Sequence, residues 1–262
     1  MFSEYQRQIL PSNQLAEVIC QLHFPKIESI AQVPPPAFRE AIRSVFPLYI
    51  IKQGVPSVSL FAKGAGPIGS SQEGQITHQF SSSDGTWRVS LCATSVSLVC
   101  RHYTRWEDFA HHLDHLLAAF IRTCCPSHFQ RIGLRYLNFI SRKCLNLEGV
   151  PYRELIHPEY LGPLAFPHLQ EQHINRCSID VDLALAQNCR AKIHAGPGVV
   201  RHKGAPDKEV RFIFDQDLYQ TGNIPISHVA ASLDTLHTNA YTLFRSAITD
   251  RLLQAMRTDP SA

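Results

Sequence analysis

The chain has 262 residues, of which 44% are hydrophobic and 18% are charged. These proportions are typical of a globular protein with a core and argue against a disordered chain. The net charge of +3 arises from 25 basic and 22 acidic residues that are spread along the sequence. Because no polybasic block concentrates the positive charge, nucleic acid is disfavoured as a partner.

The start of the chain and its cysteines bear on where the protein works. The opening residues, MFSEYQRQILPSNQ, lack the basic region, apolar core and small-residue cleavage site of a signal peptide. No segment approaches the roughly 18 apolar residues that a membrane-spanning helix requires. The eight cysteines follow no disulfide framework spacing, so reduced and mostly buried thiols are expected. We therefore predict a cytoplasmic, soluble protein with no membrane partner.

Hydrophobic periodicity predicts strands and one short helix over the first hundred residues. A strand is expected from Leu15 to Phe24, with a helix as the alternative because Leu15, Val18, Ile19 and Leu22 have helical spacing, and an amphipathic helix is expected from Phe38 to Phe46. The segment from Leu48 to Cys100 alternates as strands do, and Asp84-Gly85 within it is the best hairpin signal in the chain.

Two long amphipathic helices each follow a strand-rich stretch. The first, FAHHLDHLLAAFIRTC, ends at Cys124, and the second, VAASLDTLHTNAYTLFRSAI, begins at Val229. A Leu-Asp pair falls at matching places in both. We therefore predict an α+β fold with two similar halves, each an antiparallel sheet packed by one long helix. The halves are residues 1–150 and residues 151–262, with one continuous domain as the alternative.

Four further strands and a connector are expected between the two helices. The strand QRIGLRYLNFIS closes the first half, and the proline-broken residues 151–166 form the connector. Three strands then follow in the segments INRCSIDVDLALA, NCRAKIHAGPG and KEVRFIFDQDLYQ.

Five segments together resemble a sporadically distributed family of uncharacterised bacterial proteins. They are NQLAEVICQLHFP, VSLVCRHYTRW, RIGLRYLNFI, FIFDQDLY and LHTNAYTLFRSAITDRLLQAM. The resemblance covers most of the chain and depends on the spacing of these segments. It implies a cytoplasmic prokaryotic protein of roughly this length and carries over no catalytic residues.

Two acidic strand motifs are the first candidate site. Asp180 and Asp182 are two residues apart on one predicted strand, and Asp215 and Asp217 are two apart on another, so each pair faces one way. If the strands are neighbours, four carboxylates gather in one patch that could hold Mg²⁺ or Mn²⁺ for phosphoryl chemistry. The alternative, which we favour, is that these acids line the solvent faces of half-buried strands.

A pair of arginines is the second candidate. Arg131 and Arg135 share a strand face and could grip a carboxylate or phosphate. The structural alternative, which we again favour, is that they form ion pairs with acids of a neighbouring strand or helix, such as Asp114.

Three other patterns carry less weight. His111 and His115 have the helical spacing of a metal pair but are expected on a solvated helix face. Residues 64–69 match the dinucleotide fingerprint GxGxxG, but no helix pattern follows them. The cysteines within predicted strands are expected to be buried and inert.

The sequence thus provides no complete catalytic set, and no cofactor is predicted. We expect a non-enzymatic binding or regulatory protein that uses a groove between the halves, or an exposed sheet edge, for a protein or small-molecule partner. The alternative is a metal-dependent enzyme acting on a phosphate ester, nucleotide or nucleic acid. In that case Asp180, Asp182, Asp215 and Asp217 are the metal ligands, with Arg131 or Arg135 as the phosphate clamp.

Overall fold

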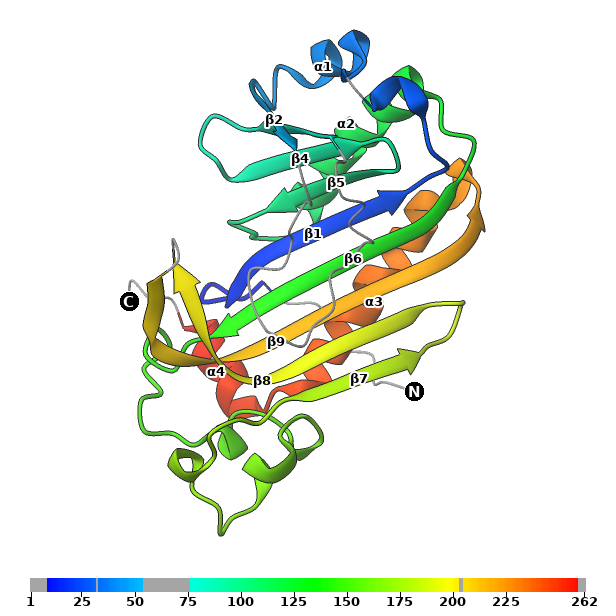
Figure 1. Cartoon of the computed structure of the whole chain (residues 1–262). Helices are drawn as coiled ribbons and strands as arrows, with labels where there is room; N and C mark the ends of the chain where they lie inside the picture. The colour runs from blue at the N-terminus through cyan, green and yellow to red at the C-terminus, as the bar shows by residue number, and fades with distance from the viewer. Residues whose placement is uncertain (1–8, 32, 54–75, 203–204, 259–262) are drawn as a thin grey trace. The chain divides into compact units, whose positions relative to one another are not determined.

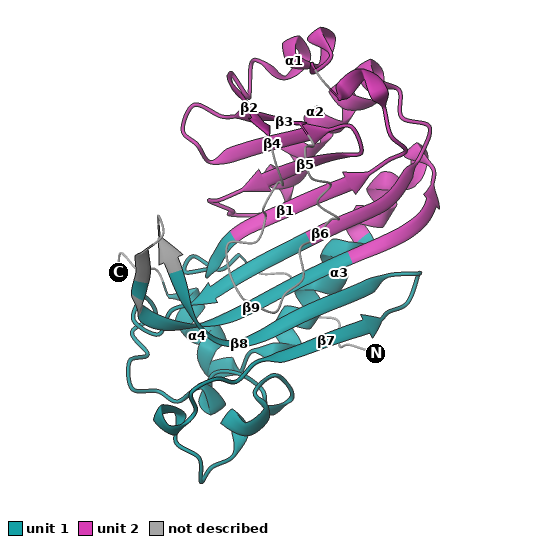
Figure 2. Cartoon of the chain, in the orientation of Figure 1, with its two compact units in different colours: residues 1–16, 135–218, 235–262 teal, residues 17–134, 219–234 magenta. Residues whose placement is uncertain are grey.

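The computed structural model describes residues 9–31, 33–53, 76–202 and 205–258. The chain divides into two compact units, each built from segments that are distant in the sequence (Figure 2). Unit 1 contains residues 1–16, 135–218 and 235–262, and unit 2 contains residues 17–134 and 219–234. Whether residues 1–150 and 151–262 are separate domains stays a prediction.

The strands of the described residues form one antiparallel sheet of nine strands, in the order β2-β3-β4-β5-β1-β6-β9-β8-β7 (Figure 1). Their bounds are β1 Leu15–His23, β2 Leu48–Gln53, β3 Ile76–Ser81, β4 Trp87–Cys92, β5 Ser95–Cys100, β6 Phe129–Ile140, β7 Ile179–Ala184, β8 Arg190–His202 and β9 Ala205–Ile224. The predicted hairpin is confirmed, because Asp84-Gly85 joins β3 to β4 and Gly85 has the positive φ of 74° that such a turn requires.

The predicted two similar halves, each an antiparallel sheet packed by one long helix, are wrong. The strands belong to a single sheet in which β1 lies between β5 and β6. Matching helix patterns record only the period of each helix, whereas strand order depends on pairing between distant segments. The internal duplication is therefore not supported, and the groove expected between two halves loses its basis.

Four α-helices lie within the described residues. They are α1 Pro36–Ile42, α2 Trp106–Cys124, α3 Val229–Ala247 and α4 Asp250–Arg257. The end of α2 at Cys124 and the start of α3 at Val229 match the sequence prediction. Helix α2 ends where Cys125 adopts a left-handed φ of 47° and its amide donates to the Ile121 carbonyl at 3.1 Å. Pro126 follows and cannot continue the helix.

Aromatic side chains join the helices to the sheet in unit 2. Phe120 of α2 lies at the centre, with ring centroids 4.8 Å from Phe24, 6.3 Å from Phe38 of α1 and 6.4 Å from Phe129 of β6. All four side chains are almost completely buried. The even-numbered residues of β1 and β3 share this side of the sheet, since Phe80 of β3 also packs on Phe38.

In unit 1, helix α3 packs against β6 and β9. Phe244 of α3 contacts Phe214 of β9 with ring centroids 6.1 Å apart. The Tyr136 hydroxyl of β6 forms a buried hydrogen bond of 2.7 Å with Nδ1 of His237, also on α3. Phe214 and Tyr136 therefore mark the helix-covered side of these strands.

Truncating Phe120 tests the aromatic core of unit 2. Phe120→Ala should lower the free energy of unfolding by about 3–5 kcal/mol, because it removes a ring that three other rings contact and leaves a cavity. Urea unfolding followed by circular dichroism measures the change. The control is Phe166→Ala, at a half-exposed ring, which should cost well under half as much.

Candidate functional site

Arg135 forms a buried, two-pronged ion pair with Asp215. Nε of Arg135 lies 2.6 Å from Oδ1 of Asp215, and Nη2 bonds Oδ2. Both side chains are only about one-tenth exposed, at 11% and 10%. The strands that carry them, β6 and β9, are neighbours in the sheet. Arg135 therefore forms an ion pair with an acid of a neighbouring strand, which is the arrangement that we favoured from the sequence, although the acid is Asp215 and not Asp114.

Asp217 lies near this pair in sequence and on the same side of β9. Phe214 faces α3, so strand alternation places Asp215 and Asp217 on the opposite side. Asp217 is also buried. The arginine and the two acids thus line the side of the unit 1 sheet that α3 does not cover.

Arg131 belongs to unit 2 and packs on an aromatic ring. Its guanidinium carbon lies 4.7 Å from the centre of the Tyr219 ring, in cation–π geometry. Gly133 makes this possible, because a Cβ there would lie 2.9 Å from the Arg131 guanidinium carbon. The glycine gives the side chain room to lie along its own strand.

The acids of β7 are paired with basic residues of β8. Asp180 stands opposite His194, with 2.8 Å between Oδ1 and Nδ1, and Asp182 lies 3.5 Å from Nη2 of Arg190. Both carboxylates are well exposed, at 62% and 48%. Their strand alternates exposed acids with half-buried apolar residues, which is the solvent-face arrangement that we favoured from the sequence.

The condition for a four-carboxylate metal site is not met. Strand β8 lies between β7 and β9, so the strands that carry the two acidic pairs are not neighbours. Within the described residues, no group of three or more His, Cys, Asp or Glu side chains is placed to hold a metal ion. Among the six predicted site residues, the structure joins Arg135 to Asp215 in an ion pair.

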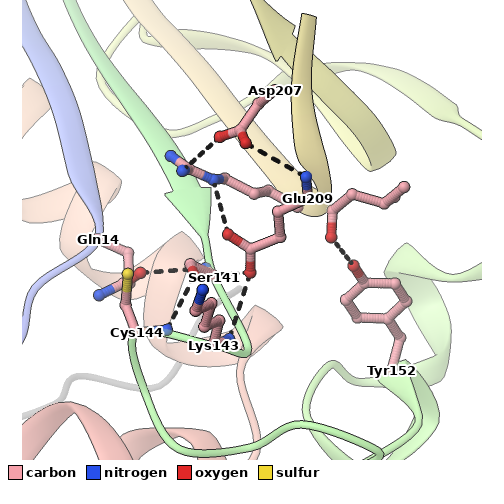
Figure 3. Close-up of polar contacts among 9 residues, drawn as sticks. Gln14, Ser141, Lys143, Cys144, Tyr152, Asp207 and Glu209 are labelled. Atoms are coloured by element: carbon pink, nitrogen blue, oxygen red, sulfur yellow. Dashed lines mark hydrogen bonds and ion pairs between the residues drawn. The ribbon is translucent and has the colours of Figure 1, made fainter.

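A second carboxylate network fixes the turn after β6 (Figure 3). Glu209 accepts hydrogen bonds from the Ser141 hydroxyl at 2.7 Å and from the Lys143 amide at 3.2 Å. Its other oxygen lies 3.2 Å from Nε of Arg211, which also pairs with Asp207 at 2.7 Å. The Ser141 hydroxyl accepts in turn from the Cys144 amide. These groups satisfy one another, so the network holds a loop in place rather than offering free groups to a ligand.

Of the three other sequence patterns, the histidine pair and the strand cysteines lie within the described residues. His111 is exposed on α2 and His115 is partly buried. Residues 64–69, with the GxGxxG match, lie outside the described residues. Burial raises the pKa of the Cys20 thiol to about 12 and that of Cys100 to about 11, as expected for inert strand cysteines.

Unit 2 carries a polar surface that we did not predict from the sequence. On the side of the sheet away from α1 and α2, hydrogen-bonding side chains lie on four adjacent strands, and we call eight of them the unit 2 polar face. They are Gln21 and His23 of β1, Thr77 and Gln79 of β3, Arg88 and Ser90 of β4, and Ser95 and Ser97 of β5. The alternate residues of these strands face the helices, as the stack of Trp87 on His112 at 3.9 Å shows.

Strand register arranges these side chains in rows. Gln79 stands opposite Ser90, Ser90 opposite Ser97, and Ser97 opposite Gln21, so one row crosses four strands. In the next row His23 stands opposite Ser95. The sequence signal was available: Ser, Thr, Gln or His recurs at alternate positions in QLH, THQ and SVS. These neutral residues form no charge pattern and no catalytic motif, so the sequence did not indicate them as a site.

Two buried groups of this face have no hydrogen-bond partner among the described residues. They are Oγ1 of Thr77, whose residue is only 4% exposed, and Nε of Arg88. Burial lowers the pKa of the Arg88 guanidinium, while Glu17 raises it and Arg101 lowers it. A buried polar atom without a partner costs stability, so these positions need an explanation other than packing.

His23 is held neutral. Its burial, and after that the positive charge of Arg131, lowers the pKa of His23 to about 4. At neutral pH the imidazole therefore carries no charge and can both donate and accept a hydrogen bond.

No family model and no curated protein matches this chain. The resemblance to an uncharacterised bacterial family therefore stays a prediction. Among the helices in the described part of the chain, none has both the length and the apolar composition that crossing a bilayer demands.

The buried Arg135–Asp215 ion pair can be tested by its effect on the free energy of unfolding. Arg135→Met alone should lower the free energy of unfolding by about 3–5 kcal/mol, because the Asp215 carboxylate stays buried without a cation. The double variant Arg135→Met, Asp215→Leu should regain most of this loss, since neither charge remains. Urea titration of the wild type, both single variants and the double variant gives the coupling energy. Additive losses would show that the pair does not act as a unit.

Because the pKa of His23 is lowered in the folded protein, we expect the free energy of unfolding to fall in acid. The unfolded side chain takes up a proton near pH 6.5, whereas the folded one does so near pH 4, so the unfolded state binds more protons between these values. Stability should therefore fall as the pH drops from about 6.5 to about 4. His23→Gln should remove a part of this fall on the order of 3 kcal/mol, measured by urea unfolding at each pH. His111→Gln, at an exposed histidine of the same unit, is the control and should leave the fall in place.

Proposed function

We propose that this protein is a cytoplasmic binding or regulatory protein that takes up a small polar molecule on the unit 2 polar face. The observation that carries the proposal is the pair of buried, unpartnered groups there, Oγ1 of Thr77 and Nε of Arg88. Natural proteins leave few such groups, and ligand sites are one place where they are retained.

The spacing of the polar rows supports a ligand with several hydroxyl or amide groups. Neighbouring strands lie about 4.8 Å apart, and residues two apart on one strand are separated by about 7 Å. The row from Gln79 to Gln21 therefore offers donors and acceptors at regular intervals, on a scale that suits a monosaccharide or a similar compound.

The charged residues of unit 1 offer less to a ligand. Arg135 is already engaged by Asp215, and the β7 acids pair across to β8. A ligand at either place would have to break an existing ion pair, whereas two buried atoms of the unit 2 polar face have no hydrogen-bond partner among the described residues.

Binding is favoured over catalysis by the state of His23. This histidine stands opposite Ser95, the arrangement of a base and a nucleophile, but a general base should have a pKa near the working pH. With a pKa of about 4, His23 is a weak base at neutral pH and is better suited to holding a ligand by hydrogen bonds.

A ligand screen tests the proposal. Thermal unfolding would be followed with a panel of free sugars, sugar phosphates, amino acids and nucleosides. A compound at a hundredfold excess over its dissociation constant should raise the free energy of unfolding by about 2.7 kcal/mol. Ser97→Val should abolish the effect while preserving the strand, because valine suits a strand and the hydroxyl is lost.

The matched control is Ser44→Val, at an exposed serine of the same unit outside the unit 2 polar face. It should keep the full response. A panel that leaves the wild type unchanged, or a response that survives Ser97→Val, would refute binding on this face.

A further inference from the structure

The unit 2 polar face has an excess of positive charge at one end. Arg88 and Arg101 both act on the same carboxylate, Glu17, which lies 3.2 Å from Nε of Arg101. Glu17 is buried, whereas Arg101 is about half exposed. Two guanidinium groups therefore share one carboxylate, which leaves one positive charge uncompensated within this cluster.

Arg88 is the member of this cluster that lacks a direct partner. Its neighbours across the strands are Ser81 and Val99, and valine offers no acceptor. Its Nε is buried without a hydrogen bond among the described residues. An arginine stays protonated at any working pH, so burial of its Nε without a hydrogen bond is costly.

We infer that the ligand of the unit 2 polar face is an anionic polyhydroxyl compound, a sugar phosphate or a sugar acid, whose anionic group binds Arg88. The inference rests on the binding function proposed above and adds the chemical class of the ligand. A carboxylate or phosphate matches the fork of donors on a guanidinium and, after a rotamer change of Arg88, would give it the bonds that it lacks.

The position of Arg88 relative to the polar row explains why the compound carries hydroxyls. Ser90 is two residues from Arg88 on β4, and so about 7 Å along the same face. Ser90 belongs to the row that continues through Ser97 to Gln21. A compound anchored by its anion at Arg88 would thus extend its hydroxyls over hydroxyl and amide side chains.

Titration calorimetry at constant ionic strength tests the inference with matched pairs of probes. The pairs are ribose with ribose 5-phosphate, glucose with glucose 6-phosphate, and glucose with gluconate. At least one anionic probe should bind ten times or more tightly than its neutral counterpart. The phosphate and carboxylate arms show which anion the site takes.

Arg88→Met should abolish that preference, so that the anionic probe binds no more tightly than its neutral counterpart. The thermal unfolding temperature of this variant without ligand should equal or exceed that of the wild type, because a methionine there buries no charge. Arg43→Met, at an exposed arginine of the same unit, is the control and should keep the preference. If Arg88→Met does not fold, Arg88→Lys replaces it and should lower the preference at least threefold, since lysine cannot form the fork.

The outcomes separate the two proposals. Anionic probes that bind no more tightly than neutral ones, or a preference that survives at Arg88→Met or Arg88→Lys, would overturn the inference alone. If none of the probes binds, neutral or anionic, both the inference and the small-molecule binding function fail.

Discussion

The fold of each unit depends on helices that cover one side of its strands. In unit 2 the rings of Phe24, Phe38 and Phe120 form that contact, and in unit 1 Phe214 and Phe244 do so. Successive residues of a strand point to opposite sides, so the residues before and after each core residue in the strand lie on the side away from the helices. The polarity and charge of the side away from the helices therefore depend on which residues alternate with the core residues along each strand.

The two units have different uncovered sides. In unit 1 the side of the sheet that α3 does not cover includes Arg135, Asp215 and Asp217, all buried, and the charges of Arg135 and Asp215 compensate each other across adjacent strands. A buried ion pair adds little net stability, but loss of either partner is costly, so the pair favours one strand register over others. We interpret this arrangement as structural.

In unit 2 the polar face consists mostly of neutral donors and acceptors, of which Thr77, Gln79 and Ser97 are buried. Thr77 and Arg88 keep buried atoms without partners in the described residues. A protein tolerates such groups where they serve a purpose other than stability. This contrast, and not a catalytic motif, is the reason that we propose a binding role for unit 2.

The sequence by itself determined the local elements and the composition of each strand face. The periods of the apolar residues placed α2, α3, β1 and β6, and the Asp84-Gly85 turn fixed one hairpin. Local periodicity suffices for these because each depends on residues close in the chain. Only the tertiary structure decided the strand order, which places β1 between β5 and β6 and β8 between β7 and β9. That order brings Arg135 next to Asp215 and separates the two acidic pairs. It also aligns Gln79, Ser90, Ser97 and Gln21 in one row. Contacts between strands come from the pairing of distant segments, which no single segment encodes.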